Sequence, residues 1–302
     1  LSIIDHFEVL LVRSETFILR FVYVFLKELI NIMRRNDKLF DSLKPKLDFL
    51  GSYFDGLRVG KPTEYDINII LNFPLNYGTI DVALNTLPLE DGMRIINLSN
   101  KHKYKVHTRV SGPANTITII KDNNDIIDVD LVPTFTFDFP KMPINSNVDF
   151  TKIKNSKIFK YFVVPKPNVD DFNWRLSFPF QERQLLKNRN NLKSTIKLIK
   201  HFRDVQCFSQ LSSYFIKTLF IWECANNDEG YWKRHSLSFL VLNMLKKLKD
   251  NLRDHCIMNF WCPTHNVLEK IKPETCQNWH NRIRHIIEDI ENGSVAGGRK
   301  LN

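Results

Sequence analysis

The sequence predicts an α+β protein with a helix and a sheet in its N-terminal part and helices in its C-terminal part. Alternating or continuous apolar runs typical of strands occur in the first half of the 302 residues, whereas helical periodicity dominates from residue 180 onward. Residues 1–43 contain neither glycine nor proline, which favours one long helix or two abutting helices at the start. Hydrophobic residues make up 43% of the chain, enough for a substantial core.

The expected elements of the first half follow from spacing. Apolar residues recur at the interval of one helix face at Ile18, Val22, Phe25, Leu29 and Ile32. Four runs are expected to be strands: Tyr65–Leu71, Tyr104–Val110, Thr116–Ile120 and Ile126–Val132. Because residues 122–125 are Asp-Asn-Asn-Asp, which favour turns, the last two strands are predicted to form a hairpin.

The second half is expected to form a helical lobe. Several prolines interrupt residues 133–167, and four segments then show helical periodicity: Gln184–Asp204, Ser212–Cys224, Leu237–Cys256 and Asn278–Glu291. We therefore expect a core over residues 1–168, a helical lobe over 169–292 and a flexible tail over 293–302.

Charge and cysteine usage limit the classes of function. Lysine and arginine number 43 against 33 acids, a net charge of +10 that favours an anionic partner. The five cysteines are odd in number and form no CxxC pair, which is typical of reduced thiols and predicts a cytoplasmic protein. The most apolar stretch, 17–33, contains Arg20, Lys27 and Glu28, so no membrane span is expected.

Two pairs of acids have the spacing of a metal site. Glu64 and Asp66 are two residues apart in an expected strand, so their side chains project from one face. Asp128 and Asp130 have the same spacing in another strand, and Asp130 is the preferred third ligand. Such hard oxygen ligands suit two ions of Mg²⁺ or Mn²⁺ that bridge substrate phosphates. Acids two apart also occur on many solvated strand faces, so the pairs alone do not establish a metal site.

A Gly51-Ser52 turn precedes the first acidic pair. Glycine lets a backbone approach a ligand closely, and amide groups with a serine hydroxyl can hold a triphosphate. A lone Gly-Ser pair is usually only a turn. The combination of this turn with acids at the start of the next strand is more specific than either feature.

Taken together, these motifs resemble the cyclic GMP-AMP synthase-like receptors of the nucleotidyltransferase superfamily. The resemblance covers roughly residues 15–290 and rests on motifs that occur in the family's order: Gly51-Ser52, Glu64-x-Asp66, Val129–Pro133, Asn173–Phe178 and Ser212–Thr218. It implies a bilobed nucleotidyltransferase fold with a long spine helix and a catalytic cleft between core and helical lobe. It also implies synthesis of a cyclic dinucleotide, cyclic GMP-AMP from ATP and GTP, in innate immunity.

The resemblance also implies roles for individual residues. Glu64, Asp66 and Asp130 would be catalytic and bind the metals, and Ser52 in the Gly51-Ser52 turn would contact the triphosphate. The remaining substrate-binding residues would be Arg175 and Ser177 at a base edge, Tyr214 stacking on a base, Ser213 at a phosphate or ribose, and Lys197 as a phosphate cation. These assignments suit the chemistry, since arginine can pair with guanine O6 and N7 and an aromatic ring stacks on any base.

The sequence departs from the vertebrate DNA sensor of this family, which carries a zinc-binding loop of one histidine and three cysteines. The corresponding residues 187–211 contain only His201 and Cys207, so no zinc is expected there. A looser group of His255, Cys256, Cys262 and His265 is a weak candidate for a metal site. The departure favours the insect-type members, which resemble receptors for double-stranded RNA, although double-stranded DNA stays open as the activator.

A basic stripe is predicted on the N-terminal helix. Arg13, Arg20, Lys27 and Arg34 are seven residues apart, and a helix drifts only about 20° per heptad, so the four would share one face. Over about 31 Å, at about 1.5 Å per residue, they could follow the phosphates of an A-form duplex. The alternative is a solvated helix face, or an Arg13 that lies outside the helix.

Three functional classes remain open from the sequence. An RNA-activated cyclic dinucleotide synthase is favoured because the acidic triad is complete. A family member that kept the fold as a non-catalytic binding or scaffold protein would often lack those acids. An enzyme that adds nucleotides to RNA ends would share the triad but not the Arg175-x-Ser177 and Ser213-Tyr214 motifs. The phosphodiester linkage and assembly into dimers or larger species on RNA stay open.

Overall fold

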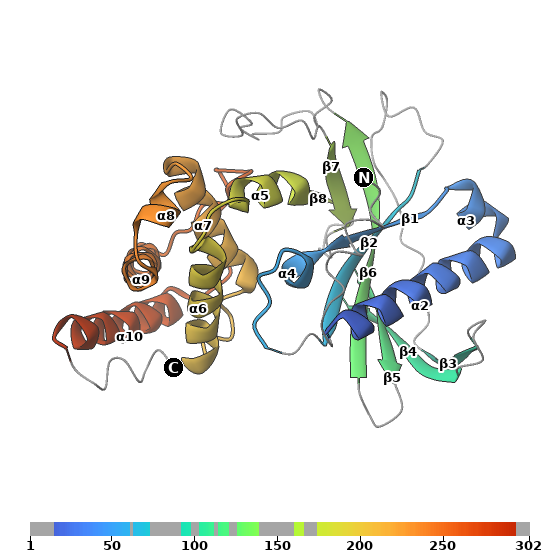
Figure 1. Ribbon diagram of the computed structural model, residues 1–302, viewed down its shortest axis with the longest axis horizontal. Helices are drawn as coiled ribbons and strands as arrows, with labels where there is room; N and C mark the ends of the chain where they lie inside the picture. The colour runs from blue at the N-terminus through green and yellow to red at the C-terminus, as the bar shows by residue number, and fades with distance from the viewer. Residues whose placement is uncertain are drawn as a thin grey trace. The chain divides into compact units, whose positions relative to one another are not determined.

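The computed structural model describes residues 15–60, 63–72, 92–97, 103–111, 114–120, 126–138, 160–165 and 174–293. For residues 15–17, 92–97, 103–105, 111, 165 and 174–175 it describes only the backbone. The described chain forms two compact units, labelled by element in Figure 1. The first contains the sheet and the N-terminal helices, and the second contains the remaining helices together with Asp55–Val59.

The described part of the first unit combines three helices with one mixed sheet (Figure 1). Its described helices are α2 (Glu15–Asn36), α3 (Lys38–Ser42) and α4 (Gly51–Phe54). Its described strands are β1 (Lys46–Leu50), β2 (Glu64–Ile70), β3 (Gly92–Asn97), β4 (Lys103–Ser111), β5 (Ala114–Ile120), β6 (Ile126–Asp138), β7 (Lys160–Pro165) and β8 (Trp174–Ser177).

The sheet is built around a parallel pair. Its strand order is β1-β2-β6-β5-β4-β3, and β7 adds to it by pairing with β6 and β8. β2 and β6 run parallel, whereas β1 with β2, β5 with β6 and β4 with β5 are antiparallel. The predicted pairing of β5 with β6 is confirmed, and the turn expected at residues 122–125 lies outside the described residues.

The core of the first unit lies between α2 and the sheet (Figure 1). Alternate residues of β2 and β6 are buried in it, namely Tyr65, Ile67, Ile69, Ile127, Val129 and Leu131. The α2 residues with the lowest exposure are Leu19, Val22, Phe25, Leu26 and Ile30. Of the five apolar positions expected to face the core, Val22 and Phe25 do so fully, and the buried face is rotated toward Leu26 and Ile30. Leu26 and Ile30 are four residues apart, so their side chains form a second buried row along one side of the predicted apolar stripe.

From residue 15 on, where the structure describes it, the N-terminal helical segment consists of two helices. α2 ends at Asn36, and Asp37 caps α3 because its Oδ1 accepts hydrogen bonds from the backbone amides of Leu39 and Phe40. Residues 1–14, and Arg13 with them, lie outside the described residues. β1, β3, β7 and β8 were not expected, and β6 continues beyond its predicted end at Val132 through Pro133 to Asp138.

The second unit is helical, as expected from the sequence. It contains α5 (Pro179–Leu186), α6 (Leu192–Val205), α7 (Ser213–Asn226), α8 (Tyr231–Arg234), α9 (Leu237–Arg253) and α10 (Pro273–Glu291). α9 and α10 lie side by side and bury Leu245, Leu248, Ile283 and Ile286 (Figure 1). No helix in the described part of the chain is long and apolar enough to cross a membrane.

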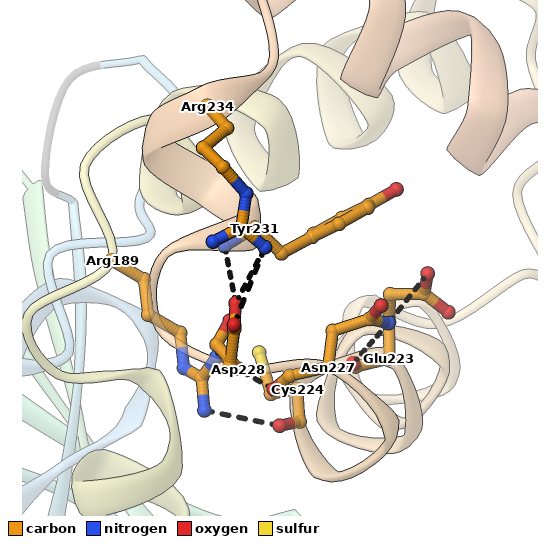
Figure 2. Close-up of polar contacts among 7 residues, drawn as sticks. All are labelled: Arg189, Glu223, Cys224, Asn227, Asp228, Tyr231 and Arg234. Carbon is orange, nitrogen blue, oxygen red and sulfur yellow. Dashed lines mark hydrogen bonds and ion pairs between the residues drawn. The ribbon is translucent and has the colours of Figure 1, made fainter.

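The prediction of one continuous helix over Gln184–Asp204 is wrong, because the helical conformation is interrupted between α5 and α6. Asn188 adopts a left-handed conformation with φ of 59°, which asparagine tolerates better than most residues. Arg189 then directs its guanidinium at the C-terminal end of α7. It donates to the carbonyls of Cys224 at 3.0 Å, Asn227 at 3.2 Å and Asp228 at 3.1 Å (Figure 2). The break therefore supplies a cation to carbonyls that α7 leaves without helical partners.

Replacing Arg189 with alanine is expected to lower the free energy of unfolding by about 2–3 kcal/mol, because charged donors to several part-buried carbonyls are lost. Urea unfolding followed by circular dichroism measures this change. The matched control is Asp228→Asn, which weakens the exposed Asp228–Arg234 pair but keeps an oxygen to accept from the Tyr231 amide. An Asp228→Asn variant that unfolds as easily as Arg189→Ala would contradict the assignment.

Candidate metal centre

Three carboxylates converge on the face of the sheet that points away from the core. β2 and β6 pair so that Glu64 lies opposite Asp128 and Asp66 lies opposite Asp130. Ligand oxygens of Glu64, Asp66 and Asp130 all lie within 4.8 Å of one another. Glu64 is exposed and Asp130 is half-buried, so the group is accessible to a ligand from solvent.

Asp130 and Asp128 are distinguished by their neighbours. The hydroxyl of Thr116, on β5, donates to Asp130 and orients it within the group. Asp128 accepts a hydrogen bond from Thr118 and forms an ion pair with Arg109 at 3.6 Å. A carboxylate already paired with a cation is a poorer ligand for another cation. The preference for Asp130 over Asp128 therefore agrees with the geometry.

Gly51 packs directly against this group. Its φ of +78° places it in the left-handed region, and a Cβ built on it would lie 1.8 Å from Asp66 Oδ2. Only glycine fits here, for both conformational and steric reasons. α4, which begins at Gly51, is fixed to the sheet by rings, since Tyr53 contacts Tyr65 edge-on at 5.0 Å between ring centroids and Phe54 contacts Phe49 at 5.2 Å.

The residues present suit Mg²⁺ or Mn²⁺. Both ions prefer carboxylate oxygens and keep some sites for water or substrate phosphates. Three carboxylates at one accessible point provide such a donor set, and no thiol or imidazole belongs to it. The group of Glu64, Asp66 and Asp130 is called the metal centre.

The other candidates of the first unit occupy the ends of elements. Ser52 is the second residue of α4, next to Gly51. Ser177 ends β8 and pairs with Phe162 on β7. The backbone of Arg175 pairs with Val164, but its side chain lies outside the described residues, so its expected contact with a base stays a prediction.

In the second unit, Ser213 and Tyr214 begin α7. Ser212 caps the helix by accepting from the amide of Phe215 at 3.2 Å. The Ser213 hydroxyl accepts a hydrogen bond from Arg203 at 2.9 Å. Sequence analysis missed Arg203, which also donates to the carbonyl of Leu211 and so closes the connection between α6 and α7. Its spacing of ten residues from Ser213 carries no local signal.

Lys197 is exposed on α6, whereas Lys200, one turn later, is buried. Lys200 donates to the carbonyl of Leu57 at 2.8 Å. Burial and the charges of Arg203 and Arg58 lower the pKa of Lys200 to about 8. Lys197 is therefore the lysine of this pair that is accessible to a phosphate, and its role there stays a prediction.

The histidines and cysteines of the weaker metal-site candidate each contact a different partner. His255 Nε2 lies 2.8 Å from the carbonyl of Ile271, Cys262 Sγ lies 3.4 Å from Thr264, and His265 lies 3.6 Å from Glu269. The five cysteines form no disulfide. Within the described ranges, Glu64, Asp66 and Asp130 form the one convergent group of three metal-binding side chains.

Comparison with known proteins assigns the chain to a family. The model of the Mab-21 protein nucleotidyltransferase domain matches residues 79–188, and that of the Mab-21 protein HhH/H2TH-like domain matches residues 191–285. The chain belongs to the Mab-21 nucleotidyltransferase family. The match to the nucleotidyltransferase domain includes Asp130, whereas Glu64 and Asp66 precede it along the chain.

Comparison over most of the chain finds relatives that share one name. The chain is 29% identical to a cyclic GMP-AMP synthase-like receptor of Tribolium castaneum, over 88% of this chain and 82% of that protein. It is 28% identical to one of Aethina tumida, over 90% of this chain and 83% of that protein. It is 29% identical to one of Trichogramma pretiosum, over 86% of this chain and 65% of that protein. The resemblance inferred from the motifs is confirmed.

Replacing Gly51 with alanine should weaken Mn²⁺ binding at least tenfold, because the new Cβ would displace Asp66 from the group. Isothermal titration of Mn²⁺ in the presence of a saturating non-hydrolysable ATP analogue measures the affinity. Gly60→Ala is the matched control, since Gly60 has a similar φ of +77° but a Cβ there would meet no atom within 4 Å. Equal Mn²⁺ affinities in the two variants would show that the contact with Asp66 is unimportant.

Proposed function

We propose that this protein is a nucleotidyltransferase that makes a cyclic dinucleotide, cyclic GMP-AMP from ATP and GTP, when double-stranded RNA binds to it. The observation that carries the proposal is the convergence of Glu64, Asp66 and Asp130 beside Gly51. A protein of this fold that acted only by binding would not need three carboxylates held together against their mutual repulsion. The names of the relatives, cyclic GMP-AMP synthase-like receptors, support the product, and the resemblance to that family supports a role in innate immunity.

The chemistry proposed for each residue is the one that the family resemblance implies. Glu64, Asp66 and Asp130 would hold two Mg²⁺ or Mn²⁺ ions, which when bound neutralise charge on the reacting phosphates. Ser52 and the backbone of α4 would bind the triphosphate next to them. Arg175 and Ser177 would select a base, Tyr214 would stack on one, and Ser213 and Lys197 would contact phosphate or ribose. Arg203 would orient the Ser213 hydroxyl by donating to it.

Free thiols at all five cysteines are compatible with the proposed cytoplasmic location, where double-stranded RNA would be met. Two features support double-stranded RNA as the activator. The sequence lacks the cysteines of the zinc-binding loop found in the vertebrate DNA sensor, and α2 carries a row of exposed cations. Arg20, Lys27 and Arg34 are all exposed, and they span about 21 Å of α2 at about 1.5 Å per residue. Arg34 forms an ion pair with Asp41 at 2.6 Å, which leaves Arg20 and Lys27 as the stronger candidates for phosphate contacts.

Asp130→Asn should reduce cyclic dinucleotide synthesis at least a thousandfold, because an amide keeps the volume but cannot neutralise the metal ions. Asp128→Asn is the matched control on the same strand and should stay within tenfold of wild type. Purified protein is incubated with labelled ATP and GTP, Mg²⁺ or Mn²⁺, and either double-stranded RNA or double-stranded DNA. An active Asp130→Asn together with an inactive Asp128→Asn would place the third ligand two residues earlier. Stimulation by DNA alone would reassign the activator.

Reversing Arg20, Lys27 and Arg34 to glutamate should weaken duplex RNA binding and lower the slope of log affinity against log salt by roughly one unit per lost phosphate contact. The control reverses Lys233, Arg234 and Lys246, which changes the charge equally on helices of the second unit. Binding is measured by fluorescence anisotropy at several salt concentrations. If only the second triple variant loses RNA affinity, the activator surface lies on α8 and α9 instead of α2.

A further inference from the structure

The sheet face that carries the metal centre also carries an arginine, Arg109 on β4. Arg109 pairs with Thr116 of β5, and Thr116 pairs with Asp130 of β6. Asp130 in turn pairs with Asp66 of β2. Residues directly opposite each other in paired strands project from the same face, so these four residues form one row across the sheet. The row leads from a cation through a neutral hydroxyl to two carboxylates of the metal centre.

A second row of similar composition lies beside the first. His107 pairs with Thr118, Thr118 pairs with Asp128, and Asp128 pairs with Glu64. In each row the threonine hydroxyl donates to the aspartate of β6. The threonines therefore occupy the strand between the basic side chains of β4 and the carboxylates, and they contribute no charge of their own.

The guanidinium of Arg109 is directed at the second row. Its Nη2 lies 3.6 Å from Asp128 Oδ2, which is too long for a hydrogen bond. The Arg109 side chain is 60% exposed and that of Asp128 is 32% exposed. An ion pair in such a solvated position contributes little free energy. A ligand from solvent can therefore reach the guanidinium and replace Asp128 as its partner.

The same contact shows how far the guanidinium extends. Asp128 lies on β6, so the side chain of Arg109 spans β5 and reaches the strand that also carries Asp130. Asp130 follows Asp128 by two residues on the same face, which is about 7 Å along a strand. Rotation of the exposed side chain by one row would bring the guanidinium beside Asp130. A phosphate held at the metal centre is thus within its range.

Charge balance at the metal centre calls for a cation in this position. Two divalent ions carry little charge beyond that of the three carboxylates that would hold them, so most of the negative charge of a triphosphate is left uncompensated. Arginine suits this task because its planar guanidinium stays ionised and offers several N–H donors to phosphate oxygens.

We propose that Arg109 binds a phosphate of the nucleotide held at the metal centre, and that Asp128 keeps the guanidinium beside the centre before the nucleotide arrives. On binding, Arg109 exchanges an exposed ion pair for hydrogen bonds to phosphate oxygens. The proposal rests on the proposed function for the kind of ligand. Its geometry comes from contacts among β2, β4, β5 and β6 of one sheet.

Two variants separate phosphate binding from the mere neutralisation of Asp128. Arg109→Gln removes the cation alone, whereas Arg109→Gln with Asp128→Asn removes the cation together with the carboxylate that it balances. Lys46→Gln is the control for loss of one positive charge. Lys46 is exposed on the same face but pairs with Ile70, four residues from Asp66 and about 13 Å along β2. Thermal unfolding should change little in each variant, because the substituted side chains are largely solvated.

The affinity for phosphate is measured by isothermal titration in saturating Mg²⁺ with two probes, a non-hydrolysable ATP analogue and inorganic tripolyphosphate. Arg109→Gln should weaken the binding of both probes at least tenfold, and the double variant should bind them equally weakly. Lys46→Gln should stay within twofold of wild type. Mn²⁺ added without nucleotide, followed by electron paramagnetic resonance, should bind Arg109→Gln within threefold of its wild-type affinity.

Three results would overturn the inference. Restored affinity in the double variant would mean that Arg109 only neutralises Asp128. Unchanged tripolyphosphate affinity in Arg109→Gln would remove the contact from phosphate, and a Mn²⁺ affinity that falls in parallel would mean that Arg109 supports the carboxylates instead.

The proposed function fails by a different result. Wild-type protein that binds both probes but makes no product with RNA or with DNA would refute the proposed synthesis, and the titrations would still decide the role of Arg109. Wild-type protein that binds neither probe would overturn both.

Discussion

The parallel pairing of β2 with β6 is the constraint on which the metal centre depends. Neighbouring strands lie about 4.8 Å apart, and side chains alternate between faces, so the register decides which residues meet. With Asp66 opposite Asp130, the acids share one face, and Tyr65 and Val129 enter the core on the other. A slip of one residue would exchange the faces, bury the acids and expose the core. The apolar residues under α2 thus determine where the carboxylates lie.

The same alternation brings like charges together, and the environment of each acid decides how this is accommodated. Carboxylates at close range repel, and solvent exposure of Glu64 reduces the cost. Asp128, which alternation places on the same face, is balanced by Thr118 on the adjacent strand β5 and by Arg109 on β4, one strand further along the sheet. Asp130 has a neutral donor, Thr116, so its charge remains available to a cation. Two acids with equal spacing in the sequence therefore differ because of residues on the adjacent strands.

Much of the fold could be predicted from the sequence because it follows from local periodicity. The strands β2, β4 and β5 and the helices of the second unit have strong period-two or helical patterns. β6 could be located but not bounded, because its continuation through Pro133 depends on its neighbours in the sheet. The break between α5 and α6 depends on a left-handed Asn188 and on Arg189 reaching carbonyls 35 to 39 residues away.

The candidate site, like the fold, has residues that the sequence predicts and residues that it does not. The triad and Gly51 could be predicted, since the acids are two apart on strands and a glycine precedes them. Arg203, Thr116 and Arg109 could not, because each acts through a contact with a residue on another helix or strand. Such contacts follow only from the packed fold. Sequence patterns identify groups that could react, whereas the residues that hold them in place emerge from tertiary structure.

The short helix α4 shows why that distinction matters for function. The turn that begins α4 is built from glycine and serine, which contribute little packing of their own. Its rigidity must therefore come from adjoining residues. Tyr53 and Phe54 contribute it through ring contacts with Tyr65 and Phe49 of the sheet. These apolar contacts hold α4 against the sheet through buried surface area. The position of Ser52 within the sheet unit therefore depends on the neighbouring rings and not on the turn residues alone.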